Sequence, residues 1–226
     1  KEHLEFSTDT VLFDTVFTTV GSTTKRFKIY NNNNAKIRVD EIELMGGSSS
    51  PFRINIDGVS GIFHEGVEIP RNDSLFAFVE VTLAVNNATN PLIISDSIRF
   101  LTNGLNQYVK LDVWGQDAYF HANEVVSGTW ANDKPHVIYG IAAVGYPGID
   151  SNLNLTIPQG TEIYCHKNAR LLVYKSSLDI QGQLGNEVTF QGDRLENFYD
   201  DVPGQWHGIH LIEANTCSIN YAIIRN

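Results

Sequence analysis

The sequence has few cysteines and no long apolar run. Its 226 residues contain two cysteines, Cys165 and Cys217, and neither belongs to a CxxC spacing. A disulfide-rich scaffold and a CxxC metal or redox site are therefore excluded, and we expect both cysteines to be buried free thiols. No run reaches the roughly 18 apolar residues that a transmembrane helix needs, so we expect no helix that spans a bilayer.

Positive charge is also scarce. The chain carries 16 Lys and Arg against 26 Asp and Glu, a net charge of −10. A surface of this sign repels phosphate backbones and anionic lipid, so we expect no nucleic-acid partner and no simple electrostatic docking on a membrane. The apolar fraction of 42% is nevertheless large enough for real hydrophobic cores.

Helical periodicity is almost absent, and short alternating stretches bounded by Asn, Gly, Pro or Ser dominate. In residues 1–118, "TKRFKIYNNNNAKIRVDEIEL" is typical of two strands joined by an Asn-rich turn, and "SIRFLTNGLNQYVKLDVWG" of a hairpin. Several short strands separated by turns predict a two-sheet sandwich. This half resembles immunoglobulin-like sandwich domains, so the sequence predicts an all-β protein that begins with an immunoglobulin-like β-sandwich.

The pattern changes after residue 118. "GQDAYFHANEVVSGTWANDKP" interrupts the alternation, and we expect a connector over residues 119–135. Over residues 136–226, each short apolar pair is followed by a bend and another pair, which indicates a chain that winds around one axis and stacks each coil on the last. The pairs are Leu155/Ile157, Leu171/Val173, Leu178/Ile180, Val188/Phe190 and Ile209/Leu211.

Two segments of this half carry a family resemblance. "LTIPQGTEIYCHKNARLLVYKSSLDIQGQLGNEVTFQGDR" and "GQWHGIHLIEANTCSINYAIIRN" resemble the first coils of a right-handed parallel β-helix of the pectin-lyase-like kind, found in surface or secreted proteins of Gram-negative bacteria. The resemblance implies an exported protein at the outer membrane or cell surface, with a lipid-anchored precursor whose lipidated Cys would precede Lys1. Because the strand "CSINYAIIRN" has no cap after it, we expect a fragment that continues beyond Asn226.

Two functional hypotheses remain open at this stage. The first is a non-catalytic surface protein whose β-helix presents one face to a polysaccharide or another cell-surface partner. The second is a polysaccharide lyase or glycoside hydrolase whose groove lies on coils beyond Asn226. No catalytic residue is assigned within the sequence, because it shows neither paired carboxylates on adjacent strands nor a nucleophile elbow.

An acidic loop, "GDRLENFYDDVPGQ", is the place where we expect a ligand, although such loops are usually only solvated surface. Clustered carboxylates can bind Ca²⁺, and neighbouring aromatic rings can stack on sugars. The ligand-binding candidates are Asp193, Glu196, Phe198, Tyr199, Asp200 and Asp201. No calcium-loop motif is present, and His207 and His210 point to opposite faces of a strand, so no metal site is assigned.

A short pattern, Asp-Ser/Thr-aliphatic, occurs four times in the first half of the chain. It resembles the O-glycosylation site of certain anaerobic Gram-negative bacteria, and it would place glycans on Thr10, Thr15, Ser74 or Ser97. The competing explanation is that Asp-Thr and Asp-Ser are ordinary turn and strand-start residues.

Overall fold

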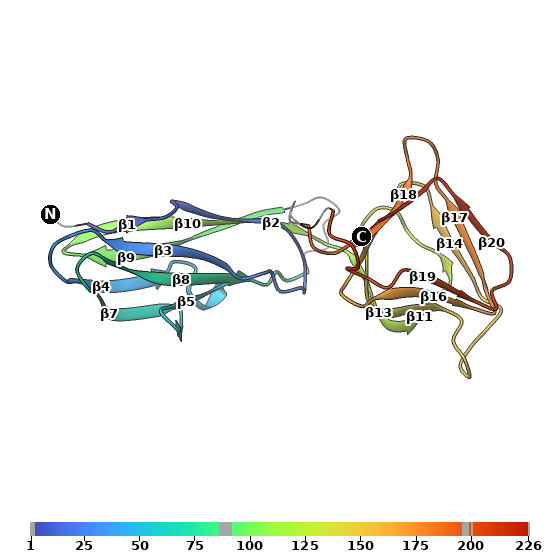
Figure 1. Ribbon diagram of the computed structural model, residues 1–226, viewed down its shortest axis with the longest axis horizontal. Coiled ribbons are helices and arrows are strands. Elements are labelled where there is room, and N and C mark those ends of the chain that lie inside the picture. Colours follow the sequence, from blue (N-terminus) through green and yellow to red (C-terminus); the bar gives the residue numbers. More distant parts are fainter. Residues whose placement is uncertain (1–2, 86–91, 196–198, 200, 226) are drawn as a thin grey trace. The chain divides into compact units, whose positions relative to one another are not determined.

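The prediction of an all-β chain is confirmed. The computed structural model describes residues 3–85, 92–195, 199 and 201–225, and apart from the short 3-10 turn η1 (Gly47–Ser49) its described elements are strands (Figure 1). The chain separates into two compact units, Lys1–Gln116 (unit 1) and Asp117–Asn226 (unit 2). Within the described residues, no helix has the length and apolar character that crossing a membrane requires.

Unit 1 is a β-sandwich of two sheets whose strands are mostly antiparallel. One sheet has the order β1-β3-β8-β5-β6 and the other the order β2-β10-β9-β4-β7. The strands are β1 (Glu5–Phe6), β2 (Thr10–Phe17), β3 (Lys25–Asn31), β4 (Ile37–Leu44), β5 (Phe52–Ile56), β6 (Val59–Ser60), β7 (Phe63–Ile69), β8 (Asp73–Val81), β9 (Leu92–Thr102) and β10 (Leu105–Gln116).

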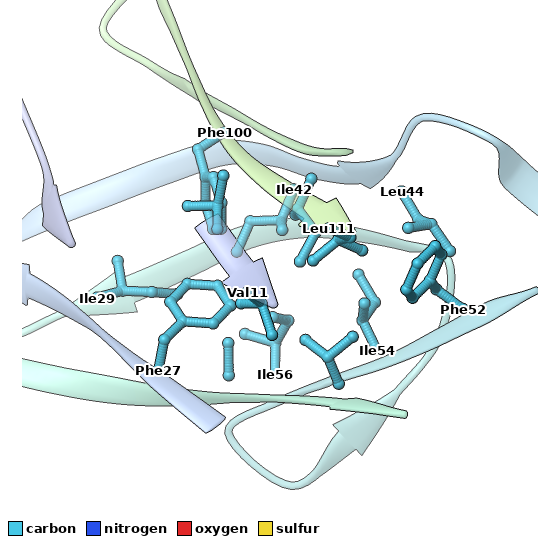
Figure 2. Packing of buried hydrophobic residues seen from close by; sticks show 14 of the residues in the cluster. Val11, Phe27, Ile29, Ile42, Leu44, Phe52, Ile54, Ile56, Phe100 and Leu111 are labelled. Atoms are coloured by element: carbon cyan, nitrogen blue, oxygen red, sulfur yellow. The ribbon is translucent and has the colours of Figure 1, made fainter. Parts of the chain in front are cut away.

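One hydrophobic core lies between these two sheets, as Figure 2 shows. Alternate residues of each strand point inward, so that Phe27 and Ile29 of β3 meet Phe100 of β9 and Leu111 of β10. The Phe100 ring lies 6.4 Å from that of Phe27 in an edge-on arrangement. The predicted sandwich is therefore confirmed, together with the inward faces that the alternation indicated.

Two strand pairings connect β10 to its neighbours in the second sheet of unit 1. β9 and β10 form a hairpin through a two-residue turn at Asn103 and Gly104, whose φ angles of 51° and 72° explain why Asn and Gly occupy it. β2 lies in parallel beside β10, with Thr10 opposite Lys110. The strand near the start of the unit is thus paired with the strand at its end.

Unit 2 is built from short parallel strands. One sheet has the order β19-β16-β13-β15-β18-β21, with β11 also paired to β13, and the other has the order β12-β14-β17-β20. The strands are β11 (Tyr119–Val125), β12 (Gly128–Thr129), β13 (His136–Val144), β14 (Asn154–Pro158), β15 (Glu162–Cys165), β16 (Arg170–Tyr174), β17 (Ser177–Gln181), β18 (Val188–Gly192), β19 (Ile209–Ile212), β20 (Cys217–Asn220) and β21 (Ala222–Ile224).

All strand-to-strand pairings among the described residues of unit 2 are parallel. In Figure 1, β13, β16 and β19 lie side by side, and so do β14, β17 and β20. Four of the five predicted apolar pairs are fully buried in one core. The fifth differs, because β19 is an edge strand and Leu211 is 49% exposed.

Residues 119–135 differ from the expected connector, because they contain two paired strands of unit 2. β11 pairs with β13 and β12 pairs with β14. The alternation is interrupted because the β11–β13 register shifts between Ala122 and Glu124. At this bulge Asn123 has a φ of 50°, and its side-chain oxygen accepts a hydrogen bond from the Ile141 N–H at 3.0 Å.

Both cysteines are free thiols. Cys165 lies in the core of unit 2, where burial raises the pKa of its thiol far above the ordinary value. Cys217 is half-buried, on the edge strand β20. The expectation of buried free thiols therefore fits Cys165 fully and Cys217 in part.

Candidate functional site

Polar and aromatic side chains gather on the outer face of β15, β18 and the end of β13. Ile138, Cys165 and Gly192 are successive ladder partners, and the Ile138 and Cys165 side chains point into the core. The residues next to them in sequence therefore point to the opposite face. Five of these neighbours, Tyr139, His166, Asp193, Tyr164 and Gln191, form what we call the polar face, together with Arg225, which donates a hydrogen bond to Gln191. The sixth neighbour, Val137, is buried.

The first column of the polar face is Tyr139, His166 and Asp193. The Tyr139 and His166 rings stack with their centroids 4.4 Å apart and an interplanar angle of 24°. His166 Nδ1 lies 2.6 Å from Asp193 Oδ2, so the N–H donates to the carboxylate and orients the imidazole. Burial, with a smaller contribution from the Asp193 charge, raises the pKa of Tyr139 to about 12.

The second column is a directed chain of hydrogen bonds. Arg225 Nη2 donates to Gln191 Oε1 at 2.6 Å, and the Gln191 amide donates to the Tyr164 hydroxyl. The Tyr164 hydroxyl in turn donates to Glu162 Oε2 at 3.3 Å. Burial, assisted by Glu162, raises the pKa of Tyr164 to about 12, so the phenol keeps its proton at neutral pH.

The two columns offer a repeating set of donors and acceptors. Neighbouring ladder positions lie about 4.8 Å apart, so polar groups recur at that interval along each column. A carboxylate, an imidazole, an amide, a guanidinium and two phenols are all present. Such a surface suits a ligand with many hydroxyl groups spread along an extended chain.

The segment between β18 and β19 leaves the sheet directly at this face, and the structure brings part of the predicted ligand loop to it. Asp193 belongs to the polar face, and its side chain is only 10% exposed because it is held by His166. The Tyr199 ring lies beneath the Arg194 guanidinium at 4.2 Å, and Asp201 is exposed. Glu196, Phe198 and Asp200 lie outside the described residues.

The calcium proposal for residues 193–201 stays a prediction. In the part of the chain that the structure describes, no three His, Cys, Asp or Glu side chains come together to hold a metal ion. The base of the loop is fixed by Gln205, whose amide N–H donates to the Tyr199 and Val202 carbonyls at 2.7 and 2.9 Å. Trp206 Nε1 also donates to the Arg225 carbonyl at 3.0 Å.

Five residues of the polar face were not predicted from the sequence: Tyr139, Tyr164, His166, Gln191 and Arg225. The first four of them belong to a spacing that was available in the sequence. Tyr139, His166 and Asp193 are each 27 residues apart, and the same interval separates Tyr164 from Gln191. Aligning the strands on this interval would have placed these side chains in columns.

A second polar cluster of unit 2 surrounds Trp130. The indole stacks on His121 at 4.5 Å and on His136 at 4.2 Å. His136 Nε2 donates to the Ala131 carbonyl at 2.7 Å, so the neutral His136 ring accepts at Nδ1 from His121 Nε2, 2.8 Å away. Burial lowers the pKa of His136 to about 4 and also lowers that of His121, an effect that Glu124 opposes at His121.

The candidate glycosylation sites lie inside paired strands of unit 1. Thr10 and Thr15 are in β2, Ser74 is in β8 and Ser97 is in β9, and all four are half-buried. Their modification stays a prediction.

The similarity of the chain to known proteins is slight. No family model matches it, and no curated protein matches it. Among solved structures, a family 123 glycoside hydrolase from Clostridium perfringens aligns over 54% of this chain and 31% of its own, with a TM-score of 0.36 and 10% identity. The E. coli chaperone DraB aligns over 50% and 56%, with a TM-score of 0.33 and 10% identity. The PapD-like domain 7 of human CEP192 aligns over 50% and 84%, with a TM-score of 0.33 and 8% identity.

These findings correct the family resemblance drawn from residues 136–226. The chain spans less than two thirds of the first two of these structures, and the three are a glycoside hydrolase, a chaperone and a PapD-like domain. None of them is a pectin-lyase-like protein. The assignment to that family is therefore wrong. The pattern of short apolar pairs in the sequence predicts the parallel strands of unit 2. Such a pattern does not identify a protein family.

Proposed function

We propose that the protein is a non-catalytic, exported cell-surface protein that binds a polysaccharide through the polar face of unit 2. In this proposal the parallel ladders are successive coils of one winding chain, so that a column of side chains follows the stacking direction. Unit 1, an immunoglobulin-like sandwich, is a spacer. The observation that carries the proposal is the ordered column Tyr139–His166–Asp193, beside the hydrogen-bonded column Arg225–Gln191–Tyr164.

The chemistry of the face supports a sugar polymer over an apolar or nucleic-acid ligand. Its groups donate and accept hydrogen bonds, and its two phenol rings, Tyr139 and Tyr164, are half-buried beside them. Sites built to hydrogen-bond hydroxyl groups discriminate strongly, because a ligand without these groups leaves buried polar atoms unpaired. The charge of −10 disfavours polyphosphates.

The variants His166→Ala and Tyr164→Phe should each weaken polysaccharide binding by about tenfold, since each removes one hydrogen-bonding group of the face. Retardation of the protein in native gels that contain single plant or bacterial polysaccharides would measure the effect. Glu213→Gln is the matched control, because Glu213 is an exposed side chain of unit 2 that does not belong to the polar face and forms an ion pair with Lys175 at 3.2 Å.

Three results would contradict this function. The unmodified protein would migrate equally in all gels, or both variants would bind as tightly as the unmodified protein. Release of new reducing or unsaturated sugar ends from a bound polysaccharide would replace a binding function by a catalytic one.

A further inference from the structure

Unit 1 has an open pocket on the outer face of the sheet β3-β8-β5-β6. Its volume is about 700 Å³, and its side-chain lining includes Thr24, Arg53, Asn55, Ser60, Phe78 and Glu80. Phe78 presents a half-buried ring to this space, next to the Phe76 ring at 6.0 Å. The pocket therefore combines an aromatic wall with hydroxyl, amide and charged groups, which is the composition of a specific ligand site.

The charge of this face is opposite to that of the chain. The outward positions of β3, β5 and β8 carry three cations, Arg26, Lys28 and Arg53, and one carboxylate, Glu80. Lys28 Nζ and the Arg26 guanidinium lie over the Phe76 ring, 5.0 and 5.5 Å from its centre. A cationic cluster on a protein with a net charge of −10 marks a place where an anion is attracted.

Hydrogen bonds to the backbone fix the orientation of the Arg53 guanidinium, which could bind that anion. Its Nη1 donates to the Ser50 carbonyl at 2.6 Å and to the Phe52 carbonyl at 2.7 Å, which fixes the plane of the guanidinium. Among the described residues, no acceptor forms a hydrogen bond with its Nε and Nη2 groups. A fixed guanidinium edge with two N–H groups fits a carboxylate in a bidentate manner.

The other polar groups fit hydroxyl groups. Glu80 accepts a hydrogen bond from the Thr24 hydroxyl at 2.5 Å, and Ser60 accepts one from the Asn55 amide at 3.0 Å. Glu80 retains further acceptor capacity and the Ser60 hydroxyl can still donate. A single ligand that has a ring for Phe78, a carboxylate for Arg53 and hydroxyl groups for Glu80 and Ser60 is an acidic sugar.

We infer that this pocket is a binding site for oligosaccharides that contain uronic acid. Arg53 binds the carboxylate, Phe78 packs against the ring of the same sugar, and Arg26 and Lys28 attract the neighbouring acidic units. The site lies on unit 1, so this inference does not depend on whether the polar face of unit 2 binds a polysaccharide.

The test is calorimetric titration of the full chain with a galacturonic acid trisaccharide, and with a neutral galactose trisaccharide for comparison. We expect the neutral trisaccharide to bind at least about tenfold more weakly than the acidic one. Raising the salt from about 50 to about 500 mM should weaken the acidic trisaccharide severalfold. Arg53→Gln and Phe78→Leu should each weaken it by about tenfold.

Two control variants separate this site from other effects. Arg71→Gln removes an exposed arginine of unit 1 that does not line the pocket, and it should leave binding unchanged. His166→Ala alters the polar face of unit 2 and should also leave binding unchanged. The urea midpoint of each variant shows that unit 1 is folded, and Phe78→Leu tests the site even where Arg53→Gln unfolds it.

The inference is overturned if the unmodified chain does not bind the acidic trisaccharide, or binds the neutral one equally well. It is also overturned if Arg53→Gln and Phe78→Leu, both folded, bind with unchanged affinity. A triglutamate peptide that binds as tightly as the sugar would show that the pocket recognises negative charge alone, and would exclude a saccharide site.

Discussion

Replacing Phe190 by alanine is expected to lower the free energy of unfolding of unit 2 by about 3–5 kcal/mol. Phe190 is fully buried in the core of that unit, between its ladder partners Ile163 and Ile224. Its ring also stacks on that of Trp206 at 6.1 Å, with an interplanar angle of 13°. The substitution removes an entire aromatic side chain and leaves a cavity that short strands cannot close.

Urea unfolding followed by tryptophan fluorescence measures this change, because Trp206 lies in contact with the replaced ring. Thr189→Ala is the matched control: Thr189 is the preceding residue of β18, is half-buried and points to the opposite face. We expect the control to change the free energy by less than about 1 kcal/mol. If Phe190→Ala lowered the free energy of unfolding by less than about 1 kcal/mol, the placement of Phe190 in the core of unit 2 would be contradicted.

The second large effect concerns acid. Unit 2 should lose up to about 3 kcal/mol of stability between about pH 6.5 and pH 4, because burial lowers the pKa of His136 to about 4. The unfolded chain binds a proton at this residue near its ordinary pKa of 6.5, whereas the folded protein binds it only near pH 4. Protons therefore favour the unfolded state in this range. The free energy of unfolding is highest, as far as His136 decides it, at neutral pH, and it decreases as the pH falls.

Urea unfolding at intervals of pH measures the slope, and the variant His136→Gln isolates it. Glutamine retains an N–H that can donate to the Ala131 carbonyl but does not titrate, so the variant should be less stable at neutral pH and less sensitive to acid. His210→Gln is the matched control, since His210 is a half-buried histidine on the edge strand β19. Equal slopes for His136→Gln and the unmodified chain would contradict the prediction.

Sequence patterning predicted unit 1 well because each of its strands buries one face only. An alternation such as Ala77, Val79 and Val81 in β8 can then be followed by eye, and all three are fully buried. The hairpin turn was predictable for a similar reason, since Asn103 and Gly104 are the residues that a two-residue turn with positive φ angles requires. Local chemistry and tertiary burial agree at these places.

The polar face and the first strands of unit 2 were harder to predict. β11 was missed because a single bulge at Asn123 shifts the phase of its alternation, so its two halves do not share one pattern. Tyr139 and His166 were missed because their contact depends on which strands stack, a long-range property that no local window contains. The acidic loop was noticed for its composition, but only the fold shows that Asp193 pairs with His166.

The parallel pairing of β2 with β10 decides when unit 1 can finish folding during synthesis. Thr10 and Lys110 are opposite each other, so about 100 residues must leave the ribosome before β2 can join its sheet. Until then the apolar side chains Val11 and Phe13 and an unpaired backbone edge stay exposed, which is the condition under which nascent chains aggregate or recruit chaperones. Although β2 is one of the first strands of unit 1 to be synthesised, it is therefore among the last strands of that unit to be paired.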